Sequence, residues 1–123
     1  MTIEDDAWHL RLDMPWTYQL FEIPLSAIHN CLLTFRAEMK SDQLKGGAFL
    51  EMWCRITGKG EFFSRSLHNK IRGTTQWASY ETPFHLKEGQ QPDLVKLNVV
   101  SEGSGQLWLR NVELLLTPFA STR

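Results

Sequence analysis

Residues 48–57, AFLEMWCRIT, constrain the fold most strongly, because apolar side chains recur at every second position. Successive side chains of a β-strand point to opposite faces of the sheet. One face of this stretch would carry only apolar side chains: Ala48, Leu50, Met52, Cys54 and Ile56. The other face would combine aromatic rings with charges: Phe49, Glu51, Trp53, Arg55 and Thr57. The pattern predicts a strand with one face in a core and a second face suited to a ligand or partner.

Seven other stretches also favour strands, and no stretch has the period of an amphipathic helix. They cover residues 7–13, 17–23, 31–39, 61–67, 77–86, 93–101 and 106–116. Turn signals such as GKG at 58–60 and EGSG at 102–105 separate them. This spacing predicts an all-β fold, an antiparallel β-sandwich of the jelly-roll type with about eight strands. We expect one domain over residues 1–123, with 1–6 as a loose leader and 40–47 as a polar loop.

Two strands carry local irregularities. Pro83 lies inside the stretch 77–86, which predicts a sheet edge or a bulge, because proline cannot donate to the hydrogen-bond ladder. In 106–116, Leu107 and Leu109 have the opposite parity to Val112 and Leu114. A β-bulge near residues 110–111 would bring all four side chains to one face.

Charge and hydropathy argue against two kinds of partner. The chain has thirteen Lys and Arg residues and fourteen Asp and Glu residues, so its formal net charge is −1. It therefore has no excess of basic residues that would favour binding to nucleic acid. No apolar run reaches the length of a membrane span, which argues against a membrane partner. The acidic N-terminus lacks the basic and apolar segments of a signal peptide, so we expect a cytoplasmic location.

Reactive residues are few and scattered. Cys31 and Cys54 both fall on the apolar parity of their strands, so we expect two buried, reduced thiols, with a disulfide between adjacent strands as the alternative. The four histidines lack zinc-ligand spacing, and no nucleophile elbow or phosphate-binding glycine loop is present. We therefore expect a protein that is not an enzyme, with no catalytic residues, metal or cofactor.

The C-terminal half resembles a known family. Residues 73–86, GTTQWASYETPFHL, and 103–115, GSGQLWLRNVELL, resemble jelly-roll carbohydrate-binding modules of the galactose-binding-like superfamily, which show T-x-W-x-x-Y and G-x-V-W-[IF]-D-D-V-x-L. The resemblance extends over residues 31–116 and implies a non-catalytic binding module with Trp77 in a structural role. Arg110 and Asn111 replace the paired acids that often help to hold calcium in the family, and Arg110 would repel a cation. We therefore expect no calcium site there.

The outward face of 48–57 supplies the candidate site. Trp53 would stack on a sugar ring, while Glu51, Arg55 and Asn98 would hydrogen-bond to its hydroxyl groups. Trp108 would add a second stacking surface if its strand shares a sheet with 48–57. In one alternative, Trp53 and Arg55 anchor a protein partner or a second copy of the chain. In another, Trp53 packs under a loop, and Glu51 and Arg55 form pairs across the strands.

Overall fold

The computed structural model describes residues 2–4 and 6–119, which form eight antiparallel strands and no helix. The strands are β1 (Thr2–Glu4), β2 (Ala7–Leu12), β3 (Trp16–Pro24), β4 (Cys31–Ile56), β5 (Gly60–Arg65), β6 (Ile71–Leu86), β7 (Pro92–Ser101) and β8 (Gly105–Pro118). The predicted all-β fold is confirmed. The described part accordingly offers no helix that is long and apolar enough to cross a membrane.

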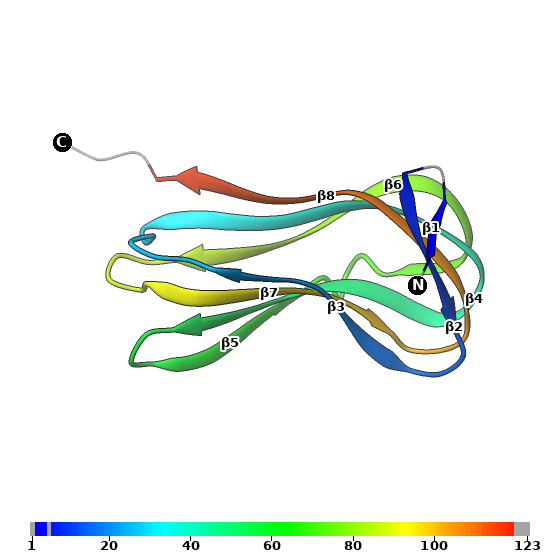
Figure 1. Ribbon diagram of the computed structural model, residues 1–123, viewed down its shortest axis with the longest axis horizontal. Helices are drawn as coiled ribbons and strands as arrows, with labels where there is room; N and C mark the ends of the chain where they lie inside the picture. The colour runs from blue at the N-terminus through cyan, green and yellow to red at the C-terminus, as the bar shows by residue number, and fades with distance from the viewer. Residues whose placement is uncertain (1, 5, 120–123) are drawn as a thin grey trace.

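The strands form one curled sheet that folds into two layers, because β4 takes part in both. Residues 31–42 of β4 pair with β6 on one side and β8 on the other, and β2 and β1 extend this first layer beyond β8. Residues 48–56 of β4 pair with β5 and β7, and β3 extends this second layer beyond β7. Figure 1 shows β4 turning back on itself at one end of the molecule. The arrangement is the predicted β-sandwich of the jelly-roll type.

The core lies between the two layers and has the predicted parity. Ala48, Leu50, Met52 and Cys54 are fully buried, and Ile56 is 2% exposed. They pack in one cluster with inward side chains of the first layer, such as Phe35 and Leu107. Burial of these apolar side chains is the main favourable contribution to the free energy of folding.

The two cysteines are free and buried, as the sequence predicts. Cys31 is 1% exposed and Cys54 is fully buried. Burial raises the pKa of both thiols, and that of Cys54 rises to about 12. Since the thiolate is the reactive form, these side chains act as small hydrophobic residues.

The expected polar loop at residues 40–47 is wrong, because β4 continues through it. Register shifts occur between Met39 and Ala48, where β4 bends from one layer into the other. The turn between β7 and β8 supports the bend: the Lys45 amide donates to the Ser104 carbonyl at 2.7 Å, and the Glu102 amide donates to the Gly47 carbonyl at 2.8 Å. The polar composition of this segment reflects a strand bend at the surface.

Both predicted irregularities are present. Between the pairs Arg36–Glu113 and Glu38–Arg110, β8 contains one residue more than β4, and Asn111 adopts φ +53°. This bulge lets Val112 and Leu114 pack against the core on the face of Leu107 and Leu109. Pro83 lies in β6, and within the described residues β6 pairs with one strand only, β4. Pro83 therefore lies at an edge of the sheet.

The N-terminal segment has more structure than a loose leader. Residues 2–4, which form β1, pair with β2. Residues 1 and 5 lie outside the described residues. The pairing adds a short edge strand to the first layer.

Candidate functional site

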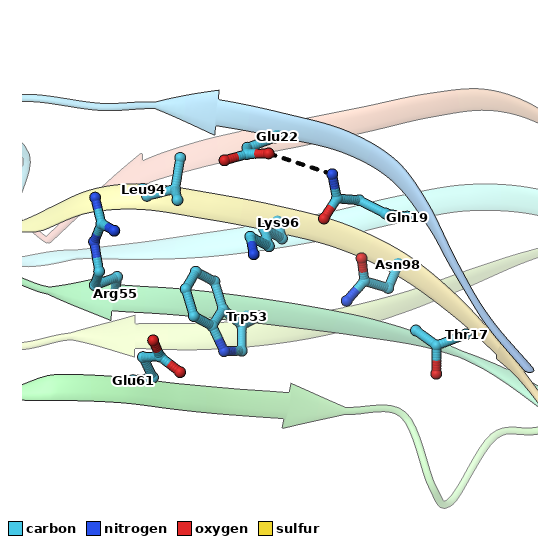
Figure 2. A pocket seen from close by; sticks show the side chains of 9 residues that line it. All are labelled: Thr17, Gln19, Glu22, Trp53, Arg55, Glu61, Leu94, Lys96 and Asn98. Carbon is cyan, nitrogen blue, oxygen red and sulfur yellow. Dashed lines mark hydrogen bonds between the residues drawn. The ribbon is translucent and has the colours of Figure 1, made fainter.

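Side chains from four strands surround a recess on the outer face of the second layer (Figure 2), which we call the outer recess. Its volume is about 570 Å³. β3, β7, β4 and β5 all contribute, and the lining residues are Thr17, Gln19, Glu22, Trp53, Arg55, Glu61, Leu94, Lys96 and Asn98. Three of the five predicted site residues, Trp53, Arg55 and Asn98, therefore line one recess.

Strand register explains why these side chains meet. Trp53 of β4 lies opposite Lys96 of β7, and Glu51 lies opposite Asn98. On the other side of β7, Asn98 lies opposite Gln19 of β3. Residues directly opposite each other in antiparallel strands have neighbouring side chains on the same face. The sheet therefore places a continuous row of polar side chains beside Trp53.

Trp53 points outward as predicted, but its side chain is not open to solvent. The residue is only 8% exposed, and the Lys96 ammonium lies 4.4 Å from the centroid of the ring. A cation over an aromatic face is attracted by the ring quadrupole. A ligand that stacks on this face of Trp53 has to displace the Lys96 ammonium.

Glu51 is engaged in contacts within the protein. Its Oε1 accepts a hydrogen bond from Asn98 Nδ2 at 2.9 Å, and its Oε2 accepts one from Arg65 Nε at 2.7 Å. The residue is 6% exposed, so these donors offset the cost of burying the carboxylate. Glu51 therefore positions Asn98 and does not itself line the recess.

Asn98 carries an acceptor without a partner. Its amide nitrogen faces the Glu51 carboxylate, so its Oδ1 points elsewhere. Among the side chains of residues 6–119, Asn98 Oδ1 is the buried polar atom for which no hydrogen bond is found. A buried acceptor without a donor costs about 1–3 kcal/mol. A hydroxyl donor brought to this position would remove that cost.

The charges of the outer recess are balanced. Arg55 Nε donates to Asp93 Oδ1 at 2.7 Å, and this hydrogen bond raises the pKa of Arg55. Two acidic residues, Glu22 and Glu61, and two basic residues, Arg55 and Lys96, line the recess. This composition suits a neutral ligand with many hydroxyl groups better than an anion or a cation.

Trp108 does not join Trp53, because the two residues lie in different layers. In β8, Trp108 lies between Lys40 of β4 and His9 of β2, in the first layer. Its ring stacks on that of His9 with centroids 4.5 Å apart, and the Lys40 ammonium lies 4.8 Å from its centroid. Although β8 and residues 48–57 belong to one curled sheet, they lie in different layers of it, so the two tryptophans do not share a surface.

The sequence interpretation missed the contribution of β3. Thr17, Gln19 and Glu22 line the outer recess, yet nothing local shows that β3 pairs with β7. Lys96 was detectable, because it shares the outward parity of Asn98. Leu94 shares that parity as well.

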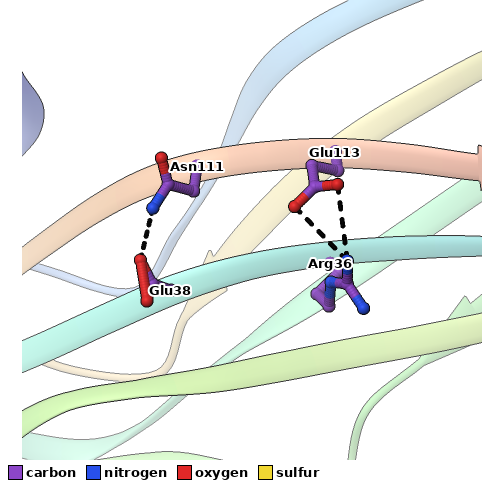
Figure 3. Close-up of polar contacts among 4 residues, drawn as sticks. All are labelled: Arg36, Glu38, Asn111 and Glu113. Carbon is purple, nitrogen blue, oxygen red and sulfur yellow. Dashed lines mark hydrogen bonds and ion pairs between the residues drawn. The ribbon is translucent and has the colours of Figure 1, made fainter.

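Arg110 and Asn111, at the position of the family's paired acids, are bound to Glu38. Arg110 Nε donates to Glu38 Oε1 at 3.0 Å. Asn111 Nδ2 donates to the same oxygen, and Figure 3 shows this second hydrogen bond. These hydrogen bonds, that of Asn111 foremost, lower the pKa of Glu38. Among the side chains that the structure describes, no three His, Cys, Asp or Glu residues are grouped so as to hold a metal ion.

Comparisons with known proteins identify the class of fold. No protein-family model matches the chain, and no curated protein matches it. Among solved structures, it is similar to one described as "CBM4 structure and function", with a TM-score of 0.66, 10% identity, and coverage of 94% of this chain and 74% of the other. It is also similar to "Family 16 Carbohydrate Binding Module-2", with a TM-score of 0.60, 12% identity, and coverage of 89% and 75%.

A third similar structure is a sugar-binding protein, the C-terminal domain of EclA. Its TM-score is 0.51 at 11% identity, with coverage of 94% of this chain and 81% of the other. The chain therefore has the jelly-roll fold of carbohydrate-binding modules, as its resemblance in sequence implied. Identities this low establish the fold, and the function has to be argued from the site.

Proposed function

We propose that this protein is a non-catalytic binding module that takes a carbohydrate or a similar neutral polyol in the outer recess. Trp53 would provide the stacking surface for one sugar ring. Asn98, Gln19 and Arg55 would form hydrogen bonds with its hydroxyl groups. The fold shared with carbohydrate-binding modules supports this proposal, and the recess has the mixture of one aromatic ring and several polar groups that suits a sugar.

The unpartnered oxygen of Asn98 is the observation that carries the proposal. Its position is fixed by the hydrogen bond from Nδ2 to Glu51, so the oxygen is oriented before any ligand arrives. A ligand hydroxyl would supply the missing donor. Preorganised groups of this kind improve affinity because little ordering is needed on binding.

Lys96 would act as the cover of the stacking surface. Its side chain is long and flexible, so it can leave Trp53 when a ring takes its place. On binding, the contact between the sugar ring and Trp53 would replace the contact between Lys96 and Trp53. Because one contact is lost for each one gained, we expect modest affinity for a single sugar unit. Lys96 could then donate to a hydroxyl group of the bound ligand.

The test is binding to a panel of neutral mono- and oligosaccharides, followed by tryptophan fluorescence, thermal shift and calorimetry. We expect saturable binding that Trp53→Phe and Gln19→Ala each weaken, the former by about tenfold, which corresponds to 1.4 kcal/mol. Trp108→Phe is the matched control, because Trp108 lies in the other layer. The melting temperature of each variant would show that it is folded.

Three results would change the conclusion. Binding lost in Trp108→Phe but kept in Trp53→Phe would move the site to the first layer. Tighter binding of charged than of neutral sugars would contradict the argument from balanced charge. Absence of binding to every sugar would favour the alternative, a protein partner or a second copy on the same face, with Trp53 and Arg55 as anchors.

A further inference from the structure

The outer edge of β5 presents unpaired backbone groups in an ordered strand. Within the described residues, the backbone of β5 pairs with β4 on one side and with no strand on the other. The Ser64 hydroxyl group of β5 forms hydrogen bonds with Thr82 and Pro83 of β6. In Figure 1, β5 lies at the lower margin of the second layer. Such an edge is a template for another strand unless the sequence obstructs it.

Register identifies the backbone groups that are exposed. The Ser66 amide donates to the Leu50 carbonyl at 3.1 Å, and Arg65 lies opposite Glu51. Hydrogen-bonded and non-hydrogen-bonded pairs alternate along antiparallel strands. The even-numbered residues of β5 therefore bond to β4, whereas the N–H and C=O groups of Glu61, Phe63 and Arg65 point away from it. Of these groups, the Arg65 carbonyl already accepts a hydrogen bond from the Leu67 amide at 2.9 Å, and its second lone pair is left for a partner strand.

The side chains at this edge are suited to a second copy of the same strand. Phe63 is 50% exposed, with Glu61 two residues before it and Arg65 two residues after it. If two β5 strands meet antiparallel about Phe63, the two Phe63 rings become neighbours. Each Glu61 then lies opposite an Arg65 of the other copy. In the same register, the backbone groups of Glu61, Phe63 and Arg65 that point away from β4 would lie opposite those of the second copy. The side chains and the backbone therefore favour the same register between the two strands.

Arg65 retains donors for this contact. Its bond to Glu51 uses the Nε–H, and a guanidinium has four further N–H groups. Its guanidinium carbon also lies 4.6 Å from the centroid of the Phe63 ring. This contact holds the Arg65 side chain beside Phe63, the residue about which the two strands would meet. The side chain of Arg65 is 46% exposed, so it is accessible to a carboxylate from outside.

The other sheet edges are obstructed or short. Pro83 interrupts the edge of β6, and a register shift between Gln19 and Phe21 distorts β3. β1 has only three residues. By contrast, β5 pairs with β4 without a register shift and contains no proline.

We propose that the chain forms a symmetric homodimer by antiparallel pairing of β5 with β5 of a second copy, centred on Phe63. The second layers of the two copies would then join into one continuous sheet. A two-fold axis perpendicular to that sheet places both outer recesses on the same side. The dimer does not depend on the nature of the ligand, but it would present two sites to one polymeric ligand and so raise the overall affinity.

The test is the mass of the intact chain in solution, measured by sedimentation and light scattering over a concentration series. The paired edge is short, so we expect a mass that rises with concentration from the monomer towards the dimer. Phe63→Lys places two like charges at the axis and should keep the chain monomeric throughout the series. Met14→Lys is the matched control, because Met14 is a similarly exposed apolar residue away from β5, and it should behave as the wild type.

A cross-link gives a second readout that does not rely on loss of association. Cα atoms of a hydrogen-bonded antiparallel pair are about 5.5 Å apart, within the range that a disulfide bridges. Phe63→Cys should form a covalent dimer on mild oxidation, and Met14→Cys should not. The native thiols are buried and do not interfere.

Two outcomes would overturn the proposal. One is a wild type that stays monomeric at every concentration and a Phe63→Cys variant that does not cross-link. The other is a Phe63→Lys variant, folded by its melting temperature, that dimerises as the wild type does. A monomer that still binds sugar would reject the dimer and leave the proposed function intact.

Discussion

At the scale of single residues, Trp53 shows that the face a side chain occupies and its exposure are separate properties. Alternation along residues 48–57 assigns Trp53 to the outward face, and the structure agrees. Two residues far away in sequence lie opposite it, Lys96 of β7 on one side and Phe63 of β5 on the other, and the Lys96 ammonium lies 4.4 Å from the ring centroid. Truncating Trp53 therefore affects stability as well as any ligand contact.

We predict that Trp53→Ala lowers the free energy of unfolding by about 2–4 kcal/mol, similar to Leu97→Ala, because both remove a large buried side chain. Trp16→Ala should change it by less than about 1 kcal/mol, because Trp16 is 58% exposed. Urea denaturation measures all three. If Trp53→Ala were as stable as the wild type, the ring would be exposed in solution.

At the scale of elements, β4 determines the architecture because it belongs to both layers. Its bend lies beside the turn between β7 and β8, and the close approach of the two backbones leaves no space for a side chain. A Cβ atom on Gly103 would lie 2.2 Å from the Lys45 carbonyl oxygen. Glycine is therefore required at this contact.

We predict that Gly103→Ala destabilises the fold by about 1–3 kcal/mol, because either the turn or the bend of β4 must shift. Ser104→Ala is the control: the backbone carbonyl of Ser104 accepts from Lys45, and the substitution leaves it in place. Thermal unfolding of the two variants measures the difference. Equal melting temperatures would show that the backbones are farther apart in solution.

At the scale of the whole molecule, stability depends on one core enclosed by the two layers. The buried cluster takes side chains from β2, β4, β6, β7 and β8, whereas β3 and β5 contribute no buried residue to it. Arg110 and Asn111, for which the resemblance in sequence implied no calcium site, form hydrogen bonds with Glu38. A core of this extent can support the fold without an ion.

We therefore predict that a calcium chelator leaves the melting temperature unchanged, and that added calcium has no effect either. Differential scanning calorimetry with and without chelator tests this directly. A loss of several degrees in chelator, restored by calcium, would mean that a metal site exists despite the positive charge of Arg110.

The sequence by itself determined the all-β class, the side chains that face the core and the bulge near residues 110–111. Each follows from the alternation of side chains along an extended backbone, which is a property of neighbouring residues. Leu107, Leu109, Val112 and Leu114 could be brought to one face only by an extra residue between them, and the structure has it.

Tertiary structure alone decided which strands are neighbours and hence what the outer recess contains. Residues 40–47 have a polar composition, yet pairing with strands distant in sequence keeps them extended. β3 lines the recess because it pairs with β7, and Trp108 is absent because β8 pairs with the other half of β4. Hydrogen bonds between strands join residues that are far apart in the chain, so no local pattern records which strands will meet.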